Sequence, residues 1–155
     1  MREITRVCGE IGVKHLTLFT FSKENWKRPR SEVNALMSLL LKTINIEVKA
    51  LHKNNVKFNI VGDLKSLPKA TVDGLTNGMK LTDSNTGLNL CLAINYGSRQ
   101  EIIETVQNIA KKVLSKELSI NEINEKLISN LLYTSGIPDP DLLIPVSYTH
   151  LRAHE

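Results

Sequence analysis

The chain alternates short apolar runs with longer helical patterns, and this alternation limits its fold more than any other feature. Three β-branched, apolar runs read as buried strands: VKHLTLFTF, VKFNIVGDL and LNLCLAINYGSR. Apolar residues recur every three or four positions in the segments before, between and after them, which predicts helices over residues 2–12, 31–54, 68–82, 99–115 and 120–131. Strands that alternate with helices are typical of an α/β domain with a mostly parallel sheet flanked by helices. We expect a fourth strand to begin within YTSGIPDPDLLI.

Two serines predict where helices begin. Ser31 is expected to be an N-cap, with Glu32 in the favourable first turn. Ser119 and Glu122 have the spacing of a capping box for the helix over 120–131.

Composition restricts the kind of protein. A chain of 155 residues with 41% hydrophobic residues can bury the core of one domain. It has no apolar run long enough to span a bilayer and no signal-peptide pattern at its start, so we expect a cytoplasmic protein. Cys8 and Cys91 lie far apart among apolar neighbours, and we interpret both as reduced core thiols.

The net charge of +4 comes entirely from residues 1–30. A basic end of this kind suits nucleic acid, an acidic membrane surface or an anionic small substrate. Nucleic-acid binding usually needs a broad basic face interleaved with aromatic residues, which make up only 5% here. We therefore expect a compact anion site and no nucleic-acid partner.

Polar residues follow each of the three predicted strands. In open α/β sheets, ligands bind beyond the carboxyl ends of the strands. We expect the segments Ser22–Arg30, Gly62–Leu64 and Asn95–Arg99 to converge there although they are far apart in sequence.

Each of these segments also has a plainer interpretation. SKENWKRP could be a solvated loop whose Trp26 packs down as an anchor, or Trp26 could wall off an apolar group beside an anion held by Ser22, Asn25 and Arg28. Arginine suits a diphosphate because its planar fork donates two hydrogen bonds at once.

The other two segments also have a plain structural interpretation. Asp63 could simply make a Gly-Asp turn. Arg99 could pair with Glu101 or another surface acid.

Four stretches match, in order, the motifs of one known family: LTLFTFSKENWKRP, VGDLKSLP, NTGLNLCLAINYGSRQEI and SGIPDPDLLI. The chain resembles the cis-prenyltransferases, the undecaprenyl diphosphate synthase family, from about Arg2 to Ile144. The resemblance implies an incomplete cis-prenyltransferase fold. It also implies a transferase that adds isopentenyl diphosphate units, in cis geometry, to an allylic diphosphate such as farnesyl diphosphate. The product would be a polyprenyl diphosphate lipid carrier.

The resemblance also assigns site residues. Matching motif positions would place these residues at the substrate: Ser22, Lys23, Glu24, Trp26 and Arg28. Asn25 would take the catalytic position that the family uses to assist proton removal. Because an amide is a poor base, we expect Asn25 to position a water or the diphosphate. Asp63, Asn95 and Arg99 would support the site. The apolar face of residues 33–51 would be a wall of the product tunnel, or simply core.

The resemblance breaks off at both ends. The family's magnesium-binding Asp and allylic phosphate loop come before the part that matches, so we expect Mg²⁺ as cofactor but no metal ligand in this chain. We interpret residues 1–144 as a partial cis-prenyltransferase domain. Residues 145–155 read as a non-native tail of sequencing or assembly origin. We expect the fragment alone to be inactive.

The resemblance further implies a homodimer, and peripheral membrane association through the lipid product. Two alternatives remain. The first is a non-catalytic accessory subunit of a prenyltransferase complex, against which the retained FSKENWKRP motif argues. The second is a basic binding module for nucleic acid or an anionic membrane surface.

Overall fold

The computed structural model describes residues 2–145 and divides the chain into two compact units, Met1–Asn95 and Tyr96–Glu155. The first unit contains α1 (Arg2–Glu10), β1 (His15–Ser22), η1 (Lys23–Lys27), α2 (Arg30–Lys53), β2 (Lys57–Val61), η2 (Leu64–Ser66), α3 (Lys69–Thr82) and most of β3 (Asn89–Tyr96). The second contains α4 (Ser98–Leu114), η3 (Ile120–Glu122) and α5 (Glu125–Leu131).

The three strands form one sheet in the order β1-β3-β2. β2 pairs in parallel with β3, with Phe58 opposite Leu90. β1 runs in the same direction as β3: the Asn89 N–H near the start of β3 donates to the Lys14 carbonyl, and the Thr20 hydroxyl near the end of β1 donates to the Ala93 carbonyl. All three carboxyl ends therefore meet at one edge. The predicted α/β class and the three strands are confirmed.

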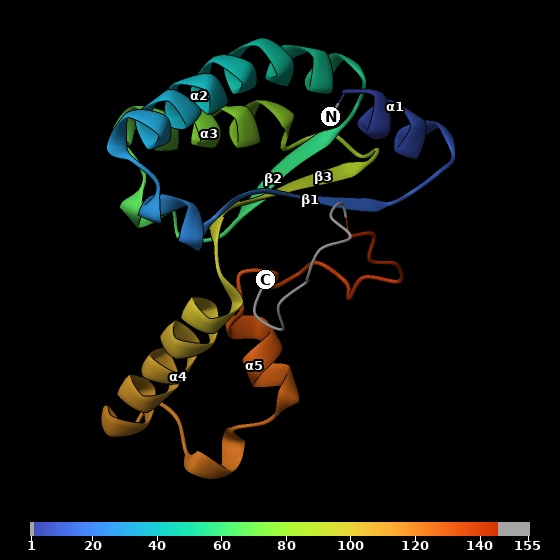
Figure 1. The fold of residues 1–155 in the computed structure, drawn as a ribbon. Helices are drawn as coiled ribbons and strands as arrows, with labels where there is room; N and C mark the ends of the chain where they lie inside the picture. The colour runs from blue at the N-terminus through green and yellow to red at the C-terminus, as the bar shows by residue number, and fades with distance from the viewer. Residues whose placement is uncertain (1, 146–155) are drawn as a thin grey trace. The chain divides into compact units, whose positions relative to one another are not determined.

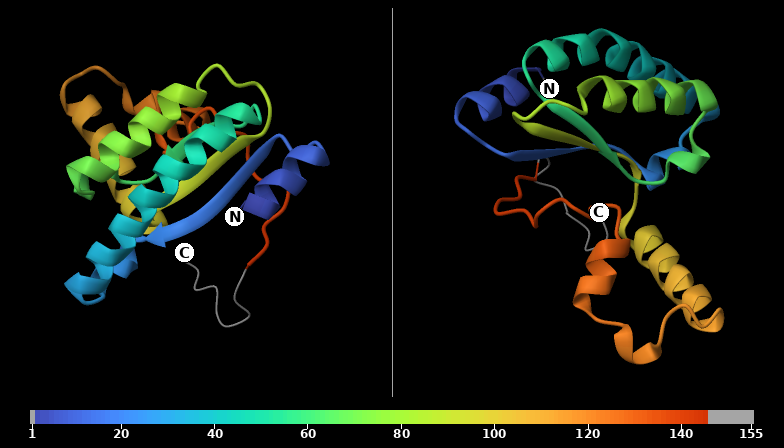
Figure 2. Two further views of the ribbon diagram at one scale, coloured as in Figure 1. Left: turned by 90° about the horizontal axis from the view of Figure 1, so that it is seen from above. Right: turned by 180° about the vertical axis from the view of Figure 1, so that it is seen from behind.

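Two helices, α2 and α3, lie side by side over one face of the sheet (Figures 1 and 2). The core lies between them and the strands, where Phe58, Leu75, Leu90 and Ile94 are almost completely buried. One polar group is built into this core. The Thr82 hydroxyl accepts the Phe58 N–H at 3.0 Å and donates to the Gly78 carbonyl at 3.1 Å, so a buried backbone donor is satisfied.

The apolar face of α2 serves mainly as core. Val33, Met37, Ile44 and Val48 are buried in the cluster beneath the helix. This confirms the plainer interpretation for these positions.

The segment before α2 differs from expectation in two ways. SKENWKRP was expected to be loop, but Lys23–Lys27 form the 3-10 helix η1. Ser31 is not the N-cap of α2, because the helix already begins at Arg30 with Pro29 in the cap position. Pro29 has φ −51°, close to helical, and its carbonyl accepts the Glu32 N–H at 3.0 Å, so the helix starts before the serine.

In the second unit the predicted helix over 120–131 is wrong in its first turn. Ser119 N–H does donate to the Glu122 carboxylate at 2.7 Å, but the box closes only the short η3. Ile123 and Asn124 are then extended, and the Asn124 side chain caps α5 by accepting the Leu127 N–H at 3.0 Å. A second, local cap therefore restarts the helix.

The predicted fourth strand is not present among residues 2–145. The segment after α5 carries Pro138 and Pro140, which have no N–H for a ladder. Leu142, Leu143 and Ile144 are each more than 70% exposed. Most of the expected non-native tail, residues 146–155, lies outside the described residues.

The two thiols differ in burial. Both cysteines are free, Cys91 is buried and Cys8 is only half-buried. Burial raises the pKa of Cys91 to about 11, partly offset by a hydrogen bond with Thr17. Cys91 thus matches the expected core thiol more closely than Cys8 does.

Candidate functional site

Three polar segments come together at the carboxyl edge of the sheet. β1 leads into Ser22 and η1, β2 leads into Gly62 and Asp63, and β3 carries Asn95 as its second-last residue. Contacts join Asn95 to the other two segments within the first unit. The expected convergence is therefore confirmed for Ser22–Arg30, Gly62–Leu64 and Asn95, whereas residues 96–99 of the predicted Asn95–Arg99 segment belong to the second unit.

Asn95 lies at the centre of these contacts. Its Oδ1 accepts the Trp26 Nε1–H at 2.6 Å, and its Nδ2 donates to the Asp63 carbonyl at 2.6 Å. Asn95 is only 1% exposed and has φ +53°, a left-handed conformation that asparagine tolerates better than most residues. One side chain thus connects η1 to the turn after β2.

Trp26 is anchored as well as placed at the strand ends. Its ring stands edge-on to Phe21 with centroids 5.8 Å apart, and its side chain packs against the core cluster. With its indole N–H on Asn95, the ring is held by both an apolar and a polar contact. The structure therefore supports the interpretation of Trp26 as an anchor, and a half-buried ring in this place can still border a ligand.

Asn25 is engaged within its own turn. Its Oδ1 accepts the Ser22 N–H at 2.8 Å, which fixes the start of η1. The carboxamide oxygen is already an acceptor in this bond, so the Nδ2 group is the part of the side chain that can serve a ligand, and it is a donor.

Lys23 and Asp63 form an ion pair across the edge. Lys23 Nζ lies 2.8 Å from Asp63 Oδ2, and the two side chains are 34% and 12% exposed. The Asp63 carboxylate also accepts from the Lys65 N–H at 3.0 Å and from the Ser66 hydroxyl. Burial of Asp63 raises its pKa, but the hydrogen bonds from Lys23 and Ser66 and the Lys23 charge outweigh it, so the pKa is lowered. Asp63 therefore stays a carboxylate at neutral pH.

Asp63 consequently has the turn role considered for it, because it caps η2. Ser66, its third partner, was not singled out in the sequence. An aspartate followed three residues later by serine is a local capping pattern that would have indicated it.

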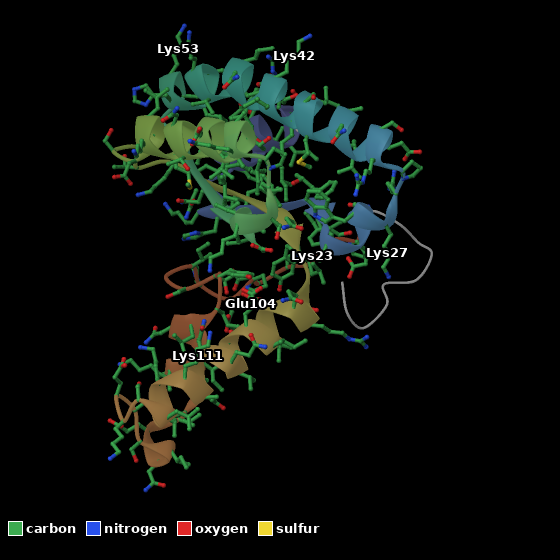
Figure 3. All side chains as sticks on the ribbon, turned by 90° about the vertical axis from the view of Figure 1, so that its left-hand side faces the viewer. Lys23, Lys27, Lys42, Lys53, Glu104 and Lys111 are labelled. Carbon is green, nitrogen blue, oxygen red and sulfur yellow. The ribbon has the colours of Figure 1, made fainter. Side chains whose placement is uncertain are left out.

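The cations beyond Trp26 face solvent. Arg28 has a side-chain exposure of 55% and lies 3.8 Å from Glu32, a loose pair of exposed groups. Lys27 and Glu24 are exposed on η1. Figure 3 shows Lys23 and Lys27 on this turn, whereas Lys42 and Lys53 project from the outer side of α2. Arg28 is thus accessible to an anion with little rearrangement.

Arg99 belongs to the second unit, where it is exposed on the first turn of α4. Its expected partner Glu101 is instead buried and accepts the Tyr96 hydroxyl at 2.9 Å and the Tyr133 N–H at 2.6 Å. Burial, followed by the contact with Glu101, raises the pKa of Tyr96 to about 12. The suggested Arg99–Glu101 pair is therefore wrong.

A separate cavity of about 1080 Å³ lies between α1, the second half of α2 and the starts of β2 and β3. Apolar side chains line part of it, among them Leu51, Val56, Leu88 and Leu90. Its rim carries an exposed ion pair between Arg2 and Glu47.

Known proteins identify the family of this chain. The family model described as "Putative undecaprenyl diphosphate synthase" matches residues 1–150. The chain belongs to this family. An isoprenyl transferase of Clostridium tetani is 51% identical over 144 residues, which are 93% of this chain and 56% of that protein. An undecaprenyl-diphosphate synthase of Pasteurella multocida is 41% identical over 147 residues, 95% of this chain and 61% of that protein.

Solved structures of the family agree with the fold. A probable undecaprenyl diphosphate synthase from Campylobacter jejuni superposes with a TM-score of 0.74 at 35% identity, covering 86% of this chain and 62% of that one. The lavandulyl diphosphate synthase of Lavandula x intermedia, solved with dimethylallyl diphosphate, gives 0.79 at 30% identity, covering 84% and 56%. The chain spans a little over half the length of the prenyltransferases it matches.

Within residues 2–145, no helix is both long and apolar enough to cross a bilayer. In the same part of the chain, no group of three or more His, Cys, Asp or Glu side chains is placed to hold a metal ion. Asp63, the carboxylate closest to the strand-end contacts, is already held by a lysine, a serine and a backbone N–H.

Proposed function

We propose that this chain carries the diphosphate-facing strand ends of a cis-prenyltransferase. The reaction condenses isopentenyl diphosphate with an allylic diphosphate such as farnesyl diphosphate, and its product is a polyprenyl diphosphate lipid carrier. One observation carries the proposal: η1, anchored through Trp26 to Asn95, presents the exposed Arg28 just past the carboxyl end of β1. Membership of the undecaprenyl diphosphate synthase family supports it independently.

Arg28 is the residue proposed to bind a substrate phosphate. Its present partner, Glu32, is 3.8 Å away and both groups are more than half exposed, a kind of pair worth at most about 1 kcal/mol. A diphosphate offers two oxygens to the guanidinium at once and a higher charge, so it would replace Glu32 as the partner. The contact would hold the diphosphate of isopentenyl diphosphate and so position the incoming unit for transfer.

Lys23 and Asn25 are proposed to orient the substrate. The Lys23 ammonium is only one-third exposed and is fixed by Asp63, so its position is set before the ligand arrives. Asn25 would donate from Nδ2 to a phosphate oxygen or to a water, because its Oδ1 is already bonded to the Ser22 N–H. This contact favours a positioning role for Asn25 over acceptance of the proton. Ser22 and the exposed Glu24 complete the proposed substrate-lining turn.

The apolar part of the substrate needs a separate place. The cavity beside α2 lies at the starts of β2 and β3, at the opposite end of the strands from Arg28, and is lined in part by Leu51, Val56, Leu88 and Leu90. We propose that it takes the far end of the growing prenyl chain. Burying each five-carbon unit there would be worth roughly 3–4 kcal/mol at about 0.8 kcal/mol per carbon.

Magnesium dependence remains a proposal from the family resemblance. The described side chains do not form a metal site, and the Asp63 carboxylate is already occupied by other partners. No step is therefore assigned to a metal held by this chain. We also propose, from family resemblance, a homodimer that acts in the cytoplasm and meets the membrane through its lipid product.

Binding of isopentenyl diphosphate to this chain tests the proposal, measured by calorimetry for the wild type, Arg28→Ala and Lys53→Ala. Lys53 is the matched control because it is an exposed cation on the outer side of α2 (Figure 3). A lost charge-assisted bond of about 1.5–3 kcal/mol corresponds to a Kd raised roughly 10- to 150-fold for Arg28→Ala. Lys53→Ala should stay within twofold. An equal loss of affinity in both variants would show that only the net charge matters and would contradict the proposed site.

The same protein can be assayed for transfer of labelled isopentenyl diphosphate to farnesyl diphosphate, for which we expect no activity from this chain alone. Co-purification of a complete second prenyltransferase, together with unchanged binding in Arg28→Ala, would favour the accessory-subunit alternative.

A further inference from the structure

Among residues 2–145, Asn95 is the one side chain with hydrogen bonds to the segments that follow both other strands. Its Oδ1 bonds the Trp26 indole and its Nδ2 bonds the Asp63 carbonyl, each at 2.6 Å. Its own carbonyl also accepts the Asp63 N–H at 3.4 Å. With 1% exposure it has no room to contact a ligand directly. Its effect on a substrate must therefore pass through the residues it holds.

The backbone of Asn95 indicates that the side chain is needed. A φ of +53° costs a non-glycine residue roughly 1–2 kcal/mol, and glycine would adopt it without that cost. The residue lies near the end of a buried strand, where the Ile94 side chain before it is fully buried. Asparagine tolerates this conformation better than most residues, and its amide supplies two hydrogen bonds that glycine could not.

The two bonds act on the two parts of the proposed site. The bond to Trp26 fixes the indole from its polar edge, while Phe21 holds the ring from another side. The bond to Asp63 fixes the turn whose carboxylate holds Lys23 at 2.8 Å. Without the amide, the indole N–H and the Asp63 carbonyl would both lose their partner, and only the Lys23–Asp63 ion pair would still join η1 to the turn after β2.

We propose that Asn95 is a positioning residue that sets Trp26 and the Lys23–Asp63 pair in place for a diphosphate substrate. It acts through these residues and does not touch the substrate. The claim about position stands on the contacts alone, whereas the claim about substrate rests on the proposed function.

The first test uses the single tryptophan of the chain, whose indole N–H gives one NMR cross-peak. In the wild type its hydrogen exchange should be at least tenfold slower than in the urea-unfolded chain. Asn95→Gly keeps the left-handed backbone and removes the amide, so exchange should accelerate at least tenfold. Asn95→Asp retains an acceptor oxygen and should keep slow exchange. Fast exchange in the folded wild type, or slow exchange in folded Asn95→Gly, would overturn the proposal.

Asn55 provides the matched control. It also has a positive φ, +57°, and its side chain bonds Thr86 through both the amide oxygen and the amide nitrogen. Asn55→Gly therefore removes an equivalent amide at a place that does not touch Trp26. Indole exchange should be unchanged in this variant, and an acceleration like that of Asn95→Gly would reduce the effect to general loosening. Should Asn95→Gly fail to fold, fast exchange in the folded wild type or in folded Asn95→Asp would still overturn the proposal.

The second test measures the Kd for isopentenyl diphosphate by calorimetry in wild type, Asn95→Gly and Lys53→Ala. Asn95→Gly should raise the Kd at least tenfold, whereas Lys53→Ala, on the outer side of α2, should stay within twofold. Equal affinity of wild type and folded Asn95→Gly would overturn the substrate part of the inference while leaving the proposed function intact. If the wild type binds no ligand, the proposed function fails, and indole exchange still decides whether Asn95 holds Trp26.

Discussion

Gly62 should be close to irreplaceable, and the structure allows the cost of changing it to be worked out. It has φ +124°, a region that residues with a Cβ rarely adopt. A Cβ built there would lie 2.1 Å from the Ile94 carbonyl oxygen and 3.1 Å from its carbon. Both are backbone atoms of β3, so no side-chain rotation can relieve the overlap.

Two terms give the size of the effect of Gly62→Ala. Holding alanine in this conformation costs about 1–3 kcal/mol. Moving the turn away from β3 also sacrifices the Asp63 N–H contact with the Asn95 carbonyl, worth about 0.5–1.5 kcal/mol. The free energy of unfolding of the first unit should fall by about 1.5–4.5 kcal/mol, which lowers its Tm by at least about 6 °C.

Urea unfolding followed by Trp26 fluorescence measures this, because the only tryptophan lies in the first unit. Gly9→Ala is the matched control: Gly9 lies in α1, and a Cβ there meets nothing within 4 Å. This variant should gain up to about 1 kcal/mol from helix propensity. A Gly62→Ala protein within about 1 kcal/mol of wild type would show that the turn is not held against β3 as described.

Three further changes test other parts of the first unit. Thr82→Val should lower the free energy of unfolding by about 1–3 kcal/mol, because the buried Phe58 N–H loses its acceptor. Thr82→Ser keeps the hydroxyl and should lower it less. Equal losses in the two variants would contradict this hydrogen bond. The pKa of Asp63 in the folded chain is below its ordinary value, so its contribution to stability is present above about pH 4 and is lost as the pH falls further. In urea titrations from pH 6 to 3, the free energy of unfolding should therefore decline less in Asp63→Asn than in wild type. Iodoacetamide at pH 8 should modify half-buried Cys8 well before Cys91, because the pKa of about 11 leaves little Cys91 thiolate. Mass spectrometry after brief labelling measures the order of modification. Modification of Cys91 before Cys8 would contradict the burial described.

The elements that the sequence predicts well are those with a long or strong apolar pattern. β1, β2 and β3 lie within the three apolar runs, and α2 ends at Lys53, one residue before the expected end. The rule that ligand-binding loops follow parallel strands also predicts that Ser22, Asp63 and Asn95 lie at one edge of the sheet.

The specific contacts at that edge could not be predicted. Trp26 and Asn95 are 69 residues apart in sequence, and Lys23 and Asp63 are 40 apart. No local pattern relates such pairs, because the partner is chosen by strand order and by the direction each loop leaves the sheet. The sequence therefore predicts which segments meet at this edge, but not the bonds between them.

The wrong predictions concern patterns whose outcome depends on neighbouring residues. Pro29 starts α2 ahead of Ser31, and Asn124 caps α5 after the Ser119 box has closed only one turn. Apolar residues 142–144 read as a strand, yet they follow two prolines and have no strand partner among residues 2–145. Caps and strand partners are decided by neighbours that a residue pattern does not contain.

The most direct test of the account is prenyl transfer by a chimera. The matched residues of this chain would replace the corresponding segment of the Clostridium tetani isoprenyl transferase, to which they are 51% identical. The account predicts that the chimera transfers labelled isopentenyl diphosphate to farnesyl diphosphate, and that Arg28→Ala lowers kcat/KM at least tenfold while Lys53→Ala does not. A folded chimera with no transfer activity, or one indifferent to Arg28→Ala, would contradict the claim that these strand ends face the substrate diphosphate.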